Sequence, residues 1–291
     1  MSAETAARDM ELEQGGELLR WEDLGSQPAG YAFRRTMREL LARPQSFFRK
    51  MALTGGLHEP LTFFAIVVAA GLLIAFPSAL AYCGLSAPDP GRVTPQAYAA
   101  HWFPARAGGL MLVLAPLVLV VGGGAMVLLG TLFHLAGKPF GARNWEGSVS
   151  IWLYAASAAL MPLVFSLGVA GAVSLAGYLI GIPWPGTRET AAHLARWTWL
   201  VLGSAGLLAG AALLVVDTAV GTMQAFGVDM AFGISAGVSG VLVASAATAA
   251  TAWAVQIGPR ATLIAVCAWA LFGLAAGFVG IVKSRRSRGG G

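Results

Sequence analysis

The sequence predicts an all-α integral membrane protein, a polytopic bundle of about six transmembrane helices preceded by an interfacial amphipathic helix. Three observations support this prediction. Hydrophobic residues make up 57% of the 291 positions, while charged residues make up only 11%, which is about half the share found in soluble domains. The mean hydropathy is +0.70. Several apolar runs are also long enough to cross the hydrocarbon core of a bilayer.

Residues 1–30 form an acidic leader that we expect to be disordered in the cytoplasm. Seven of the 14 acidic residues of the chain lie in its first 23 positions. A segment with this much charge and so few apolar residues cannot bury a core. We expect no secretory signal at the start of the chain, because the first apolar run begins only about 60 residues in.

Residues 31–60 are predicted to hold a short basic amphipathic helix and a linker. Apolar residues recur at helical spacing from Phe33 to Leu41, with arginines between them, and Pro44 ends the pattern. A helix of this kind suits a surface of anionic lipid headgroups. The candidate lipid-surface contacts are Arg34, Arg35, Arg38, Phe47, Phe48, Arg49 and Lys50. The alternative is a helix that packs on its own protein.

The basic residues predict the orientation of the chain in the membrane. Six of them lie between Arg34 and Lys50, before the first apolar run, and four lie between Lys283 and Arg288, after the last. Positively charged segments next to membrane spans stay in the cytoplasm. We therefore expect a transmembrane helical domain at 61–283 and a basic tail at 284–291. Both termini should be cytoplasmic, and the expected location is the bacterial cytoplasmic (inner) membrane.

The first predicted span runs from Leu61 past Ala81, and an external loop follows at 84–106. The second, at 108–135, contains Pro116 and three consecutive glycines, and is predicted to be one kinked span. Residues 148–182 are too long for one perpendicular helix and short for two. Cytoplasmic termini require an even number of spans, which favours one long crossing there over a hairpin at Pro162.

Beyond this run, residues 187–199 are predicted to form an external interfacial helix whose tryptophans, Trp197 and Trp199, belong to the aromatic belt. Three further spans are expected at about 199–216, 232–255 and 261–282. Pairs of glycines four residues apart allow close helix packing in lipid and suggest a tight bundle or a homo-oligomer. These pairs are Gly177 and Gly181, Gly206 and Gly210, Gly233 and Gly237, and Gly273 and Gly277.

The sequence contains no complete catalytic or metal-binding motif. Ser235 fits a G-x-S-x-G pattern, but no histidine follows position 193 to activate it. Two cysteines and four scattered histidines are too few and too far apart for a zinc site. We therefore expect no enzyme activity, no cofactor and no metal. We also expect no nucleic-acid partner, because the basic residues flank membrane spans. Cys83 is expected to be buried as a small apolar side chain.

Three polar residues in or beside the spans are candidate functional groups: His134, Asp217 and Gln224. Ionisable groups in a membrane are functional candidates by default. Asp217, however, is placed at the cytoplasmic end of its span, where a structural or capping role is the simpler interpretation.

Several segments resemble bacterial Yip1-domain membrane proteins. The resemblance rests on Leu41, Pro44, Phe47-Phe48, Gly55-Gly56 and Glu59-Pro60 before an apolar span, on the run from Leu132 to Ala158, and on Trp21-Glu22-Asp23. It covers about the first 160 residues and, loosely, 221–246, and the chain departs from it between 163 and 199. Eukaryotic members of the family have five spans and associate with Rab-type GTPases. No residue-level motif transfers that role to this chain.

Two functions follow from these observations. The preferred one is a non-catalytic membrane organiser or adaptor that recruits anionic lipid headgroups or a protein partner not yet known. The alternative is a small-solute transporter or channel that works through helices kinked by proline and glycine. The first is favoured because no predicted span carries a central charge, which coupled transport would require.

Overall fold

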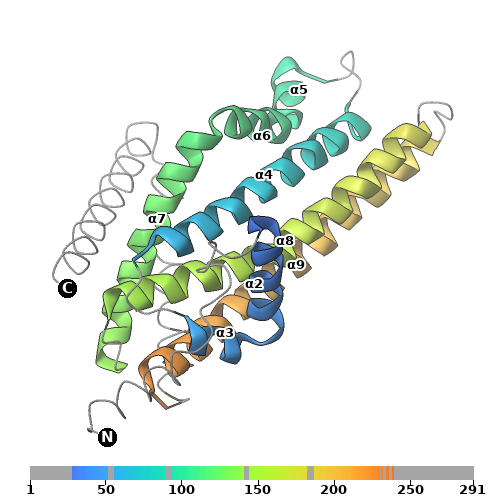
Figure 1. The fold of residues 1–291 in the computed structure, drawn as a ribbon. Helices are drawn as coiled ribbons and strands as arrows, with labels where there is room; N and C mark the ends of the chain where they lie inside the picture. The colour runs from blue at the N-terminus through green and yellow to red at the C-terminus, as the bar shows by residue number, and fades with distance from the viewer. Residues whose placement is uncertain are drawn as a thin grey trace, which may run out of the picture. The chain divides into compact units, whose positions relative to one another are not determined.

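The computed structural model describes residues 28–51, 56–88, 93–140, 144–181 and 187–229, together with 231, 234, 235 and 238. These residues form eight α-helices, α2 to α9, and one short 3-10 helix, and contain no strand (Figure 1). The all-α prediction is therefore confirmed for this part of the chain. Most of the predicted leader, the predicted fifth and sixth spans, Cys267 and the basic tail lie outside the described residues.

Four of the described helices are long and apolar enough to cross a membrane, which fits an integral membrane protein. They are α4 (His58–Leu85), α7 (Ala115–Gly137), α8 (Trp145–Gly181) and α9 (Arg188–Phe226). At 1.5 Å per residue, α8 and α9 are each about 55 Å long, whereas a hydrocarbon core is about 30 Å thick. Each of these two helices must therefore be strongly tilted or extend beyond the hydrocarbon.

The basic segment forms two helices, α2 (Ala29–Ala42) and α3 (Pro44–Lys50). Pro44 separates them, because a residue that precedes proline is driven out of the helical region. Arg43 accordingly has φ −143° and ψ 60°, and Pro44 opens α3 at its first turn, where the missing N–H costs nothing. The turn before α4 uses Gly56 at φ 88°, a left-handed conformation that favours glycine.

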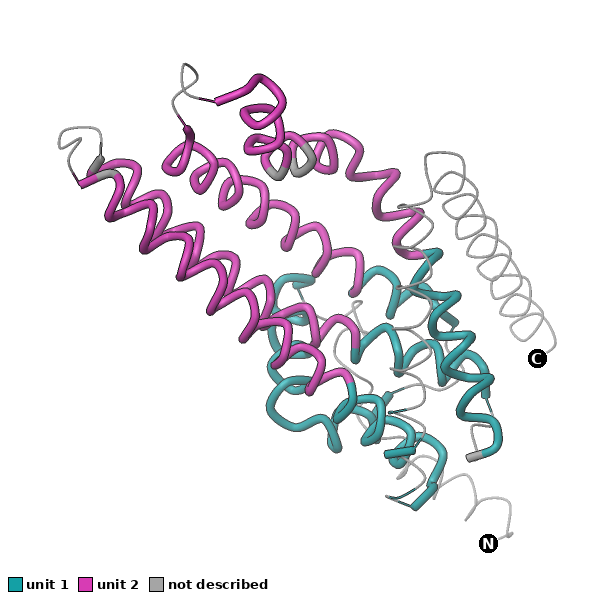
Figure 2. Tube along the Cα trace, turned by 180° about the vertical axis from the view of Figure 1, so that it is seen from behind, with its two compact units in different colours: residues 1–63, 124–155, 215–291 teal, residues 64–123, 156–214 magenta. Residues whose placement is uncertain are grey.

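The chain divides into two compact units (Figure 2). Unit 1 comprises residues 1–63, 124–155 and 215–291, and unit 2 comprises 64–123 and 156–214. Unit 1 therefore contains α2, α3, the short 3-10 helix Lys138–Phe140 and one end each of α4, α7, α8 and α9. Unit 2 contains α5 (Pro95–His101), α6 (Phe103–Val113) and the remaining parts of the four long helices.

Unit 1 has an aromatic core in which α8 is central. Tyr154 of α8 contacts Phe47 of α3 and Phe63 of α4, with ring centroids 5.0 and 5.3 Å apart. On the same helix, Trp152 lies 5.8 Å from Phe133 of α7. Side chains of this size dominate the packing energy of a core. They fix the N-terminal helices α2 and α3 to the ends of the long helices.

In unit 2, small residues of α9 allow it to approach α8 closely. A Cβ added at Gly206 would lie 3.0 Å from the carbonyl oxygen of Pro162, and one at Gly210 would clash with the carbonyl oxygen of Ala159. This pair packs within the chain, as the predicted tight bundle requires. The formation of a homo-oligomer stays a prediction. The indole N–H of Trp199 donates to Ser174 Oγ at 3.0 Å, which further joins the two helices.

The predicted second span is not one kinked helix. A break at Leu114, with φ −90° and ψ 17°, separates α6 from α7. It comes two residues before Pro116, which lacks the N–H that would bond to Leu112. The run 122–124 of three glycines, by contrast, lies inside α7 without interruption.

The two other ambiguous regions of the sequence each form one continuous helix. Residues 148–181 lie in α8, which passes through Pro162 without a hairpin. This agrees with the expected single long crossing, which itself stays a prediction. The helix predicted at 187–199 is present, and it is continuous with the following span because residues 188–199 are the first turns of α9. Its location at a membrane interface stays a prediction. Trp199 lies 5.5 Å from Tyr82 as well as bonding to Ser174, so it packs within the protein.

The predicted external loop at 84–106 contains helix α5 and the start of α6. Thr94 caps α5 by accepting a hydrogen bond from the Ala97 N–H at 3.3 Å. Cys83 is fully buried, as predicted, and its thiol donates to the carbonyl oxygen of His101 at 3.4 Å. This contact ties α5 to the end of α4.

Candidate anion-binding groove on helices α2 and α3

A polar groove of about 560 Å³ lies on the N-terminal helices of unit 1. Its basic lining residues are Arg34, Arg35, Arg38, Arg43 and Lys50. The remaining lining residues are Tyr31, Glu39, Ala42 and Ser46. Five cationic groups against one carboxylate make this a site for an anion. Its volume falls in the range of small-molecule sites.

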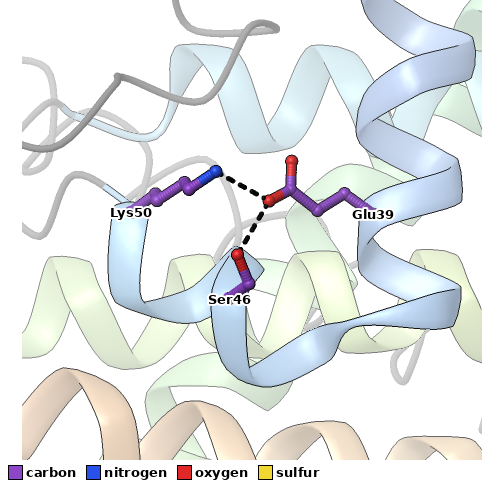
Figure 3. A network of polar contacts seen from close by, with 3 residues as sticks. All are labelled: Glu39, Ser46 and Lys50. Atoms are coloured by element: carbon purple, nitrogen blue, oxygen red, sulfur yellow. Dashed lines mark hydrogen bonds and ion pairs between the residues drawn. The ribbon is translucent and has the colours of Figure 1, made fainter.

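The groove has a defined shape because Glu39 ties its two helices together (Figure 3). The Glu39 carboxylate oxygen Oε1 lies 3.0 Å from Lys50 Nζ and accepts a hydrogen bond from Ser46 Oγ at 3.1 Å. Glu39 belongs to α2, whereas Ser46 and Lys50 belong to α3. The ammonium of Lys50 is therefore already paired within the protein.

The arginines of the groove have no carboxylate partner among the described residues. Within the described part of the chain, no carboxylate lies within ion-pair distance of Arg34, Arg38 or Arg43. The guanidinium of Arg35 contacts only the hydroxyl of Tyr31, at 3.5 Å, among the described side chains. Guanidinium groups bind phosphate and carboxylate oxygens through two parallel N–H donors. The arginines are therefore available to an external anion.

The predicted lipid anchor at Phe47 and Phe48 is corrected by the structure. Their side chains are 0% and 1% exposed, so neither can reach a lipid surface. The two rings contact each other edge to face at 5.0 Å, and Phe47 also contacts Tyr154. Phe48 lies against α9 as well, since a Cβ added at Gly221 would be 3.2 Å from its ring. These side chains hold α3 in the core of unit 1.

The apolar face of α2 is also buried by the protein. Ala32, Met37 and Leu40 are buried, and Phe33 contacts Phe63 of α4 at 4.9 Å. This bears out the alternative interpretation, in which the helix packs on its own protein. The arginines occupy the opposite, exposed face. The location of that face at a membrane surface stays a prediction.

Arg49, the remaining predicted lipid contact, does not line the groove. Its Nε donates to Gln224 Oε1 at 3.4 Å, which joins α3 to the end of α9. Gln224, predicted as a polar group of a span, is thus engaged in a helix–helix contact. The other candidate, His134 of α7, has Nδ1 3.0 Å from Ser148 Oγ of α8. Ser148 Oγ also donates to the Asn144 carbonyl oxygen at 3.0 Å.

Asp217 is the third predicted polar residue, and the structure buries it. It is 1% exposed, and its Oδ2 has no hydrogen-bond partner among the described residues. It lies on α9 one turn before Gly221, on the face that packs against Ile151 of α8. The structure therefore places Asp217, Gln224 and His134 in three different surroundings, and they do not line one described cavity.

We expect Asp217→Asn to raise the melting temperature of the purified protein by the equivalent of about 1 kcal/mol, because a buried carboxylate without a partner is destabilising. Thermal unfolding in neutral detergent measures this change in melting temperature. Asp229→Asn is the control, since Asp229 is exposed and its replacement should change nothing. A lower melting temperature for Asp217→Asn would mean that the carboxylate stabilises the fold through a partner of its own.

Sequence reasoning missed five lining residues of the groove: Tyr31, Glu39, Ala42, Arg43 and Ser46. One signal could have revealed the pairing of Glu39 with α3. Pro44 predicts a sharp turn, which would bring acidic and basic residues on either side of it together. Spacing alone does not give the angle of that turn.

No family model, curated protein or solved structure matches this chain.

Proposed function

We propose that this protein is a non-catalytic, multi-pass membrane organiser or adaptor that binds anionic lipid headgroups in the groove of α2 and α3. The observation that carries the proposal is a groove of defined shape whose arginines pair with no carboxylate in the described part of the chain. Basic residues beside a membrane span are attracted to anionic lipid by about 1 kcal/mol each. Because α2 and α3 are packed on the ends of the long helices, a bound headgroup would be held by the body of the protein.

The experiment is a charge reversal of Arg34, Arg35 and Arg38 to glutamate in the full chain. The full chain is needed because the apolar faces of α2 and α3 are buried by the rest of the protein. Native mass spectrometry in neutral detergent measures the retention of added phosphatidylglycerol. We expect a loss of at least about tenfold in affinity, since three favourable charges of about 1 kcal/mol each are removed.

The control for the charge reversal is Arg196→Glu, an exposed arginine of α9 outside the groove. It should leave phosphatidylglycerol retention unchanged. Equal retention by the triple variant and the unaltered chain would contradict lipid binding in the groove. If the unaltered chain retained phosphatidylcholine as well as phosphatidylglycerol, a role for charge in lipid binding would be contradicted.

The proposal includes a topology of six spans with cytoplasmic termini. It is supported by the continuous helices α8 and α9 and by the basic residues of α2 and α3 ahead of α4. If α4, α7, α8 and α9 each cross once, the groove is cytoplasmic. Residues before α6 and at the start of α9 then share the external side.

Single cysteines test this topology in a background in which Cys83 and Cys267 are serine. An impermeant thiol reagent added to intact cells should label cysteines at Gln96 and Thr190 and leave one at Gln45 unlabelled, because only the first two are external. All three positions are exposed. Labelling of the cysteine at Gln45 would overturn the topology. So would labelling at only one of the two positions Gln96 and Thr190.

The resemblance to Yip1 proteins remains part of the proposal. Its support is that the matching residues mark structural boundaries: Pro44 begins α3, Phe47-Phe48 anchor it, and Gly56 forms the turn before α4. The second candidate function is small-solute transport, favoured by the unsatisfied carboxylate of Asp217 and by the break at Leu114. The groove supports the first function more directly, because it supplies both the charge and the space for a ligand.

A further inference from the structure

We infer that the groove takes a lipid headgroup carrying two phosphate groups in preference to one carrying a single phosphate; this inference rests on the proposed function. The first argument is charge. With Lys50 paired to Glu39, four arginines remain for the ligand. One phosphodiester carries a single negative charge and would leave most of this charge uncompensated. Two phosphate groups offer enough oxygens to engage the four guanidinium groups in pairs.

The second argument is spacing. Arg34 and Arg38 are one helical turn apart, about 6 Å along α2, and Arg35 lies beside them. Arg43 follows the end of the helix, about 7 Å further along the axis than Arg38. The groove thus has one group of arginines on α2 and another position at the α2–α3 turn, and both line the same cavity of about 560 Å³. A single phosphate cannot contact both ends of such a row.

The third argument concerns Glu39. Its carboxylate occupies the space next to Lys50 and Ser46 (Figure 3), so that end of the groove already holds an anion. A ligand must therefore bind through the arginines and avoid the negative charge of Glu39. Glu39→Gln should remove the one negative charge from the groove and strengthen the binding of a lipid with one phosphate, which reduces the preference for two.

The experiment uses the full chain in neutral maltoside micelles and native mass spectrometry. The probes are diphosphatidylglycerol, which has two phosphates, and twice its molar amount of phosphatidylglycerol, so that total charge is equal. We expect a Kd at least about tenfold lower for diphosphatidylglycerol. Arg43→Gln should lower this preference at least about threefold, because it removes the arginine at the α2–α3 turn and so weakens the binding of diphosphatidylglycerol more than that of phosphatidylglycerol. Arg196→Gln, outside the groove, should change neither.

A second binding measurement, with soluble inorganic pyrophosphate, distinguishes a site for a lipid headgroup from a site for a free anion. Inorganic pyrophosphate should bind at least about tenfold more weakly than diphosphatidylglycerol, because it lacks acyl chains. Equal Kd values for pyrophosphate and lipid would overturn the assignment to lipid. Equal Kd values for the two lipids, both retained above phosphatidylcholine, would overturn the two-phosphate inference and leave the proposed function standing. Retention of neither lipid above phosphatidylcholine would overturn the proposed function itself.

Discussion

Phe47→Ala is expected to destabilise the protein by about 3–5 kcal/mol, because it removes a fully buried ring from the centre of unit 1. The ring touches both Phe48 and Tyr154, so its loss leaves a cavity between α3 and α8. For a domain of about 200 residues this corresponds to a fall of at least about 6 °C in the melting temperature. Thermal unfolding in neutral detergent, with and without added anionic lipid, measures the change.

The matched control is Phe165→Ala on α8, whose side chain is 74% exposed. An exposed ring contributes little to packing, so the melting temperature should change by no more than about 2 °C. If Phe47 were a lipid anchor, its loss would reduce lipid binding and spare stability. That outcome would contradict the core position described here.

Gly210→Ala is expected to cost about 1–3 kcal/mol, since the added methyl group meets the carbonyl oxygen of Ala159 on α8. A backbone atom cannot rotate away as a flexible side chain can, so α8 and α9 must separate. Gly203→Ala on the same helix is the control, because a Cβ there has no neighbour within 4 Å. Alanine is the better helix former, so Gly203→Ala should leave the melting temperature unchanged or raise it.

The same pair of variants tests the role of the glycine pair on α9. Because Gly206 and Gly210 face α8 of the same chain, Gly210→Ala should lower stability without changing the oligomeric state. Light scattering after size-exclusion chromatography measures that state. A shift from oligomer to monomer at unchanged melting temperature would restore these glycines to an interface between copies.

Much of the fold could be predicted from local properties of the sequence. The length of the apolar runs, the low share of charge and the basic residues before α4 indicate a helical membrane protein. The continuity of α8 through Pro162 was also predictable, because a hairpin there conflicts with the positive-inside expectation for the basic tail. The position of the break at Leu114 did not follow, since proline and glycine are tolerated inside membrane helices and only neighbouring contacts decide which of them bends the chain.

The candidate site was only half predictable. Arg34, Arg35 and Arg38 stand out because charge beside a membrane span has few roles, and the structure places all three in the groove. Glu39 and Ser46 could not be assigned to it, since their contact with α3 depends on the angle that α3 makes after Pro44.

The sequence by itself determined which side chains avoid water, and only the tertiary structure decided what they touch instead. The sequence pattern places Phe47 and Phe48 at a lipid surface, and it allows Gly206 and Gly210 to serve either a tight bundle or a second chain. All four residues pack inside their own chain. The physical reason is that lipid tails and a protein core are almost equally apolar. An aromatic or small residue therefore carries no local mark of which one surrounds it, and the paths of helices distant in sequence make the choice.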